Sequence, residues 1–438
     1  MAVVAVLAGG ISPALAATTA ATTSRVSVSS SEAQADNASN DAVISANGRF
    51  VAFSSSATDL VPGDTNGARD VFVRDLIGGT TSRVSVSSGG VQPNGDFSIL
   101  PAISADGRYV AFNSDASNLV SGDTNATNDV FLRDRQAGMT RRVSVSTAGG
   151  QGNAYSGLRL ALSADGGHVA YTSEASNLVP GDTNNWGDLF VRDVSAATTS
   201  RVNVSGTGAQ DTALHTTDDP AISAGGRYVT FSSSASTLVP GDVNGKADVF
   251  IRDRIAGTTA LVSVSTAGTQ GDRASSGASI SAGGRFIAFT SPASNLVTDD
   301  TNPRADVFVR DRATGTTTRI SVSNASAQAN GDSYLPSISA DGRYVAFTSV
   351  ASNLVRGDTN HFLDVFVRDR RSGSTSRLSV SSSGAQANGN SNTEGAGAIS
   401  ADGRSVVFGS QATNLVPADT NATDDVFLRD RGASAGSG

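Results

Sequence analysis

Two aspartates and one asparagine recur at a fixed spacing at seven places in this chain of 438 residues. The first set lies in the segment Gly-Asp-Thr-Asn that begins at Gly63. The sets are Asp64, Asn66 and Asp70; Asp123, Asn125 and Asp129; Asp182, Asn184 and Asp188; Asp242, Asn244 and Asp248; Asp300, Asn302 and Asp306; Asp358, Asn360 and Asp364; and Asp419, Asn421 and Asp425. Each set supplies two carboxylates and an amide oxygen, and Ca²⁺ takes about six to eight oxygen ligands. These residues are therefore candidate metal ligands, with calcium as the candidate cofactor.

The same residues have a second interpretation as turn formers. The spacing differs from that of an EF-hand, which needs a third early acidic ligand, a glycine at the sixth position and a distal glutamate. In an Asx turn, Asp64 and Asn66 would accept hydrogen bonds from nearby backbone N–H groups, while Asp70 fixes the start of the next strand. The sequence leaves both interpretations open.

A glutamine also recurs seven times, in the segment that leads from one repeat to the next. The positions are Gln34, Gln92, Gln151, Gln210, Gln270, Gln328 and Gln386. We expect a structural hydrogen bond from each glutamine to the adjacent loop, where the repeated aspartates are within reach.

The search for catalytic residues assigns none. The segment from Gly432 to Gly436 matches Gly-x-Ser-x-Gly, but no strand precedes it and no helix follows it, as a nucleophile elbow requires. The chain has no cysteine and three histidines, and no set of histidine and carboxylate residues has the spacing of a metalloenzyme.

Aromatic residues and histidines that break the repeat are the candidate ligand-binding residues. They fall in the long segments between predicted strands, and they are Phe97, Tyr155, Trp186, His215, Tyr334, His361 and Phe362. Long loops on a rigid scaffold are where binding usually resides. The alternative is that these side chains pack against their own loops.

The elements that position these residues are seven repeats of near-constant length. A segment such as Ile-Ser-Ala-Asp-Gly-Arg-Tyr-Val-Ala-Phe starts at Ile44, Ile103, Leu162, Ile222, Ile280, Ile338 and Ile399, so that successive starts are 59, 59, 60, 58, 58 and 61 residues apart. Each repeat contains four strand-like segments, and the two middle ones are apolar on both faces. Such strands lie between neighbouring sheets, as in a propeller blade.

The order of the strands predicts how the ring closes. The segment Arg-Val-Ser-Val-Ser at Arg25 precedes the first repeat, and no copy follows the last strand, which starts at Asp425. The N-terminal copy therefore completes the seventh blade. The sequence predicts an all-β, seven-bladed β-propeller of four-stranded blades, closed by its N-terminal strand and leaving no open sheet edge between its ends.

Fourteen aromatic residues occupy two fixed strand positions and are predicted to form the core between blades. They are Phe53, Phe112, Tyr171, Phe231, Phe289, Phe347 and Phe408, followed by Phe72, Phe131, Phe190, Phe250, Phe308, Phe366 and Phe427. The pair that ends the third strand, such as Arg74 and Asp75, is predicted to form solvated or inter-blade ion pairs.

The segments at Leu100 and Leu335, Leu-Pro-x-Ile-Ser-Ala-Asp-Gly-Arg-Tyr-Val-Ala-Phe, resemble TolB-like β-propeller repeats of the WD40-like type. That family has a Ser-Pro-Asp-Gly turn before an apolar and aromatic strand. The resemblance covers nearly all of residues 24–430 and implies the propeller fold. This chain differs in having alanine at the turn proline and a long loop with Gly-Asp-Thr-Asn, and no α/β domain like that of TolB is predicted before its repeats.

Composition indicates an exported bacterial protein. Residues 1–16 read as a signal peptide that lacks a basic n-region, residues 17–23 as a linker, residues 24–430 as one propeller and residues 431–438 as a tail. The net charge is −8, and the arginines lie among aspartates, so no basic patch for nucleic acid is predicted. No segment has the roughly 20 apolar residues of a transmembrane helix. We expect a secreted or periplasmic monomer.

Three functions fit these features. The first is a non-enzymatic scaffold that binds a protein or peptide through the long loops. The second is a calcium-assisted module that binds glycans or cell wall. The third is a hydrolase or lyase whose active site forms at the mouth of the propeller channel.

Overall fold

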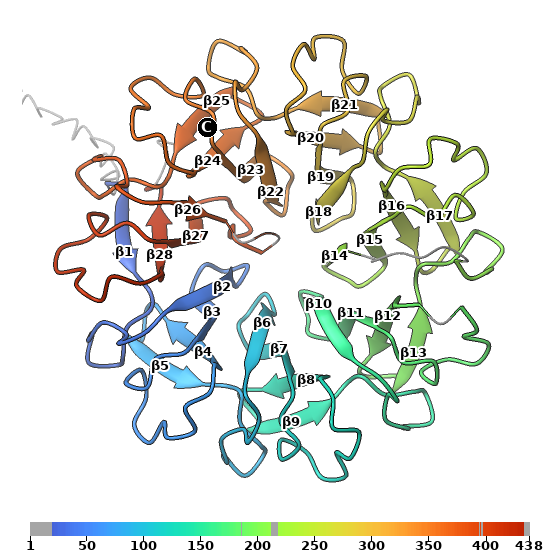
Figure 1. The fold of residues 1–438 in the computed structure, drawn as a ribbon, viewed down its shortest axis with the longest axis vertical. Coiled ribbons are helices and arrows are strands. Elements are labelled where there is room, and N and C mark those ends of the chain that lie inside the picture. The colour runs from blue at the N-terminus through green and yellow to red at the C-terminus, as the bar shows by residue number, and fades with distance from the viewer. Residues whose placement is uncertain (1–19, 185, 212–217, 394, 396, 433–438) are drawn as a thin grey trace, which may run out of the picture.

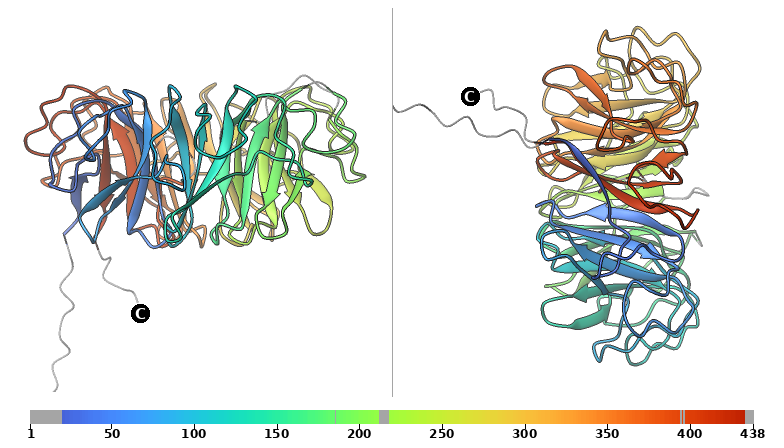
Figure 2. Two further views of the ribbon diagram at one scale, coloured as in Figure 1. Left: turned by 90° about the horizontal axis from the view of Figure 1, so that it is seen from below. Right: turned by 90° about the vertical axis from the view of Figure 1, so that its left-hand side faces the viewer.

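A computed structural model describes residues 20–184, 186–211, 218–393, 395 and 397–432. These residues form 28 strands and no helix, and the strands build seven four-stranded antiparallel sheets. The sheets surround a central opening as the blades of a propeller (Figure 1). Seen from the side, the molecule is a flat disc (Figure 2). The predicted all-β, seven-bladed fold is confirmed.

Each blade has its first strand at the centre of the ring and its fourth at the rim. The innermost strands are β2 (Ser39–Ile44), β6 (Ser98–Ile103), β10 (Ser156–Leu162), β14 (Asp218–Ile222), β18 (Ser276–Ile280), β22 (Ser333–Ile338) and β26 (Ser391–Asn392). The second strands are β3 (Phe50–Ser55), β7 (Tyr109–Ser114), β11 (His168–Ser173), β15 (Tyr228–Ser233), β19 (Phe286–Ser291), β23 (Tyr344–Ser349) and β27 (Ser405–Ser410). The third strands are β4 (Asp70–Asp75), β8 (Asp129–Asp134), β12 (Asp188–Asp193), β16 (Asp248–Asp253), β20 (Asp306–Asp311), β24 (Asp364–Asp369) and β28 (Asp425–Asp430). The fourth strands are β5 (Thr80–Arg83), β9 (Met139–Arg142), β13 (Thr198–Arg201), β17 (Thr258–Leu261), β21 (Thr316–Arg319), β25 (Ser374–Arg377) and β1 (Thr22–Arg25).

The N-terminal strand closes the ring as predicted. β1 pairs antiparallel with β28, so that Thr22 lies opposite Asp430 and Arg25 opposite Phe427. The Thr23 hydroxyl also donates a hydrogen bond of 2.5 Å to the carbonyl of Val380 in the preceding blade. β1 thus begins at Thr22, inside the segment predicted as a linker. It pairs the N-terminal part of the chain with the last strand, β28, in blade seven.

The fourteen repeated aromatic side chains form the core, as the sequence predicts. In every blade the aromatic residue of the second strand lies opposite that of the third, and both are fully buried. The ring centroids are 5.7–6.0 Å apart, within the range of favourable aromatic pairs. Around Phe53 the core combines residues of blades one and seven, such as Val407 and Val426, so the apolar interior is shared between neighbouring blades.

A ring of backbone hydrogen bonds joins the tight turns between the first and second strands. In blades two to seven the turn alanine donates its N–H to the carbonyl of the turn alanine in the next blade. These bonds are Ala105 to Ala164, Ala164 to Ala224, Ala224 to Ala282, Ala282 to Ala340, Ala340 to Ala401 and Ala401 to Ala46, at 2.8–3.0 Å. At the remaining junction Asn47 N–H donates to Ala105 at 3.2 Å. Proline lacks an N–H, so the alanine that departs from the TolB-like pattern makes these bonds available.

The two faces of the disc differ. One carries the tight turns, and both Thr22 and Asp430 lie there. The other carries the long connections from second to third strand and from fourth strand to the next blade; we call it the long-loop face. In the described part of the chain, no helix is long and apolar enough to cross a membrane.

In blades two to seven the glycine of the tight turn packs on an aromatic or imidazole ring of the preceding blade, which gives a stability prediction. Gly107 has φ +76°, and a Cβ added there would lie 2.2 Å from Cδ2 of Phe50. We expect Gly107→Ala to lower the free energy of unfolding by about 2–5 kcal/mol, since positive φ costs roughly 1–2 kcal/mol and overpacking roughly 1–3 kcal/mol. Urea denaturation measures the loss.

The matched control is Gly122→Ala. Gly122 has φ +73°, and nothing lies within 4 Å of an added Cβ. This variant should lose only the backbone cost, about 1–2 kcal/mol. Equal losses in the two variants would show that the contact with Phe50 contributes nothing.

Candidate functional site

An arginine of the fourth strand lies between the two repeated aspartates in six of the seven blades. The six arginines are Arg25, Arg83, Arg142, Arg201, Arg319 and Arg377. Each guanidinium lies 2.9–3.6 Å from both carboxylates, and its side chain is at most 10 % exposed. In these six blades the arginine side chain therefore supplies the positive charge that balances the two aspartates at the base of the long loop.

Blade one shows how the cluster is held. Arg83 Nη1 is 2.9 Å from Asp64 Oδ1 and 2.9 Å from Asp70 Oδ2. The fully buried Asp70 also accepts hydrogen bonds from the Ser85 hydroxyl at 2.6 Å and from Asn66 Nδ2 at 3.1 Å. The cluster ties the loop to the start of β4 and to the outer strand.

The repeated asparagines form Asx turns, as one of the two interpretations predicts. In all seven blades the asparagine Oδ1 accepts a hydrogen bond of 2.9–3.4 Å from the backbone N–H two residues later. Asp64 differs from that interpretation, because its partner is the guanidinium of Arg83. The turn fixes the backbone of the residue two positions after the asparagine, which lies at the outermost point (the crest) of the loop.

The repeated glutamines bind this loop, as expected. Each Oε1 accepts a hydrogen bond from the backbone N–H that follows the first aspartate of the set. Four of the glutamines also donate Nε2 to that aspartate: Gln34, Gln151, Gln270 and Gln328. The two long connections of each blade are thereby joined.

Blade four departs from this plan. Leu261 lies opposite Phe250, in the register position that Arg83 occupies opposite Phe72. Val243 replaces the threonine of the loop and is 84 % exposed. Burial raises the pKa of Asp248 to about 6, as it does that of Asp306 in blade five.

The predicted ligand-binding residues fall into two groups. Phe97, Tyr155 and Tyr334 are half-buried where the innermost strands begin. Trp186, His361 and Phe362 are exposed on the loops between second and third strands, with Trp186 40 % and Phe362 39 % exposed. His215 lies outside the described residues. The structure therefore does not unite the candidates in one pocket but distributes them over the long-loop face.

Trp186 and Phe362 occupy the same crest position in different blades. This position lies two residues after the repeated asparagine and is Ala68, Thr127, Trp186, Lys246, Arg304, Phe362 and Thr423 in blades one to seven. Blades three to six, which are neighbours in the ring, carry large aromatic or cationic side chains there, all exposed. We call Trp186, Lys246, Arg304 and Phe362 the crest arc.

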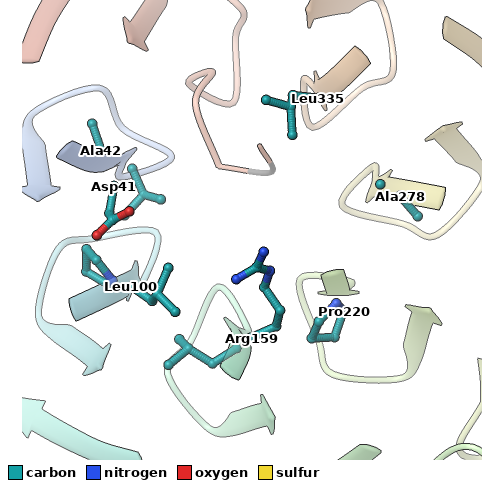
Figure 3. Close-up of a pocket in the computed structure, with 11 residues that line it drawn as sticks. Asp41, Ala42, Leu100, Arg159, Pro220, Ala278 and Leu335 are labelled. Carbon is teal, nitrogen blue, oxygen red and sulfur yellow. The ribbon is translucent and has the colours of Figure 1, made fainter. Parts of the chain in front are cut away.

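A cavity of about 270 Å³ opens at the channel mouth on the long-loop side. Its lining includes Asp41, Leu100, Arg159, Pro220 and Leu335, and the Arg159 side chain extends into the opening (Figure 3). A second cavity of about 210 Å³ follows deeper in the channel and is lined mainly by apolar residues of the innermost strands. Asp41 and Arg159 are the charged residues among those that line the two cavities.

The residues of this mouth were not predicted from the sequence, because β-bulges place their side chains. The register of β2, β6 and β22 shifts near its start, and there Asp41, Leu100 and Leu335 adopt φ values of 58°, 53° and 54°. Positive φ is costly for such residues, and bulges re-aim side chains. These three residues lie three positions before the repeated Ile-Ser at Ile44, Ile103 and Ile338. The position can be located in the sequence, but no characteristic residue type marks it as a bulge.

The tight-turn face carries a separate set of ion pairs. Asp75 accepts two hydrogen bonds from Arg49 of its own blade, at 2.9 and 2.7 Å. Arg74 is not the partner of Asp75, because its buried guanidinium donates to the carbonyl of Ser29 in the neighbouring blade and pairs with Glu32. The prediction for Arg74 and Asp75 is thus corrected to two different interactions, one between blades and one within a blade.

Comparison with known proteins supports the fold. No protein-family model and no curated protein matches the chain. Solved structures similar to it include an oligogalacturonate lyase in complex with manganese, with a TM-score of 0.55, 10 % identity, and coverage of 95 % of this chain and 94 % of the lyase. The propeller domain of the Trilobed protease from Pyrococcus furiosus, with an open velcro topology, has a TM-score of 0.54, 11 % identity, and coverage of 90 % and 93 %.

TolB from Acinetobacter baumannii is also similar, with a TM-score of 0.40, 16 % identity and coverage of 70 % of this chain. The chain spans 58 % of the length of that TolB. The likenesses with TM-scores of 0.55 and 0.54 support the fold alone. The sheet topology of the chain itself defines the class, a seven-bladed β-propeller closed into a ring by its N-terminal strand.

Removal of one guanidinium tests the energetic role of the cluster. We expect Arg83→Met, measured in EDTA, to lower the free energy of unfolding by about 3–5 kcal/mol, because two buried carboxylates lose their positive partner. Chemical denaturation measures the loss. The control is Arg356→Met, since Arg356 is exposed. A loss no larger than that of the control would contradict a structural role for the cluster.

The ion pairs of the tight-turn face predict a loss of stability in acid. Hydrogen bonds from Arg108 and Arg227 lower the pKa of Asp134 and Asp253, respectively, to about 2. A carboxyl whose pKa is lower in the folded than in the unfolded state adds stability above its unfolded pKa, and this contribution is lost as pH falls from about 4 to about 2. The melting temperature should fall through that window. Arg108→Gln should make the fall shallower, and identical pH profiles would refute this assignment.

Proposed function

We propose that this propeller is a non-enzymatic scaffold that binds an extended protein or peptide segment on its long-loop face. The observation that carries the proposal is the crest arc. Trp186, Lys246, Arg304 and Phe362 lie at one structural position of four consecutive blades, and the equivalent residues of the other three blades are small.

The composition of the crest arc suits a protein partner. Tryptophan and arginine are enriched among residues that dominate protein interfaces, and they act best when their backbone is held in place. The Asx turn holds each of the four crests, and in blades three, five and six a buried guanidinium also holds the base of the loop. In the described residues, five of the nine exposed large apolar side chains lie on this face: Leu158, Trp186, Val243, Val350 and Phe362.

The channel mouth supplies a second point of contact in this proposal. The cavity beside Arg159 and Leu335 lies at the centre of the same face, with an apolar wall and one charged residue of each sign. Its volume of about 270 Å³ is near the lower limit for a small-molecule site, roughly 300 Å³. A side chain or a chain terminus of the bound segment fits this size. Among the described residues that line it, Asp41 carries the one carboxylate and none is a histidine.

The proposed place of action is outside the cytoplasm, in the periplasm or the extracellular medium. The support is the signal-like sequence of residues 1–16, which lie outside the described part of the chain, together with the absence of cysteine from the sequence.

A peptide selection tests the function. Peptides selected from a random library against the purified chain should bind with an affinity that falls about tenfold or more in Trp186→Ala and Phe362→Ala, because truncating an interface aromatic residue commonly costs 1.4 kcal/mol or more, which is about tenfold in Kd. Isothermal calorimetry or fluorescence anisotropy with the selected peptides measures the change.

Matched controls lie on the opposite face. Ile77 and Ile255 are 78 % and 77 % exposed in turns of the tight-turn face, and Ile77→Ala and Ile255→Ala should leave the affinity unchanged. Loss of binding in these controls, or unchanged binding in the crest variants, would refute the proposal. Binding of soluble polysaccharides that is lost in the crest variants would replace the peptide by a glycan.

A further inference from the structure

Blade four contains the same pair of buried carboxylates as the other blades but lacks the cation between them. Asp248 is fully buried and Asp242 is 7 % exposed. Leu261 stands where the other blades place arginine, and neither aspartate forms an ion pair with any residue that the structure describes. Two negative charges are therefore held in a poorly solvated place without a positive partner.

The hydrogen bonds of these carboxylates leave one oxygen open. Asp248 accepts bonds from the Ser263 hydroxyl at 2.6 Å and from Asn244 Nδ2 at 2.7 Å. Asp242 Oδ1 accepts a bond from Gln270 Nε2 at 2.9 Å, whereas its buried Oδ2 has no partner in the structure.

An open Oδ2 also occurs in two blades that contain the arginine, at Asp64 and Asp300. In both of them Oδ1 pairs with the guanidinium, so the charge of the carboxylate is already balanced. Blade four combines the open oxygen with the missing charge. An unpaired buried carboxylate is costly, and a bound cation removes that cost.

We propose that Asp242 and Asp248 bind one divalent metal ion of the calcium type, at the place that a guanidinium occupies in the other six blades. Six blades of this chain show that the two carboxylates accept a cation there. The donors are oxygen atoms, which hard cations prefer, and calcium commonly completes its coordination with water and backbone carbonyls. A divalent ion balances both carboxylates, which a monovalent ion does not.

This inference narrows the seven candidate metal sets to one. The same triplet of two aspartates and an asparagine is present in every blade, but in six of them the arginine competes for the space and the charge. The ion would brace the loop that carries Val243 and Lys246, as the guanidinium braces the other loops. The inference does not depend on the proposed peptide binding.

Calcium titration of the full chain after treatment with EDTA tests the proposal. Calorimetry should show one bound Ca²⁺ per chain, and the melting temperature should be higher in millimolar CaCl₂ than in EDTA. Leu261→Arg copies the six native blades, and it should abolish both the heat of binding and the calcium-dependent shift while raising the melting temperature in EDTA. Leu261→Met is the matched control and should bind calcium as the native chain does.

A gain-of-site variant makes the test independent of blade four. Arg83→Leu recreates the open pair in blade one, so the stoichiometry should rise from one to two. Absence of binding in the native chain at millimolar calcium would overturn the proposal and leave a proton as the partner of the pair. Binding that persists in Leu261→Arg, or a stoichiometry of seven, would also overturn it, because the ion would then lie elsewhere.

Discussion

The contact on which the long-loop face depends is a guanidinium held between two buried carboxylates. Arg83 comes from the outermost strand, Asp64 from the long loop and Asp70 from the start of the third strand, so one charged group joins three segments of the blade. Burial makes each charge expensive alone, and the serine, asparagine and glutamine bonds around the cluster compensate for the lost water. The cluster therefore ties the long loop to the outermost strand and to the start of the third strand.

The residues that hold the long loop in place are different from the crest residue that varies between blades. The asparagine Oδ1 and the glutamine Oε1 hold the backbone at both sides of the crest in every blade, whichever residue the crest carries. The crest position can therefore be Ala68 in blade one, Trp186 in blade three and Phe362 in blade six, while the backbone hydrogen bonds of the loop stay the same. On the tight-turn face the reverse holds, because the ring of alanine bonds and the glycine contacts leave little freedom for substitution.

Much of the fold could be predicted from the sequence because its signals are local and repeated. The near-constant spacing, the paired aromatic positions and the extra copy of the outer strand at Arg25 are sufficient for seven blades and their closure. The arginine between the aspartates was not predicted. It lies 13 residues from Asp70 along the chain, and its orientation depends on the pairing of two strands. The residues that line the channel mouth were not predicted for a similar reason, since a bulge changes the direction of Leu100 and Leu335 without changing the repeat.

Repetition within one chain also gives each deviation a reference. Leu261 would be an ordinary half-buried apolar residue in a protein without repeats, but six equivalent arginines show which interaction it removes. Val243 and Leu261 occur in the same blade, and together they withdraw a hydroxyl and a guanidinium from one cluster whose carboxylates are retained. Retention of both acids at a place that has lost its base is unfavourable for folding alone, because each buried charge costs several kcal/mol when unpaired. Retention of both aspartates is explained if blade four binds a cation from solution at the place where the other six blades hold an arginine side chain.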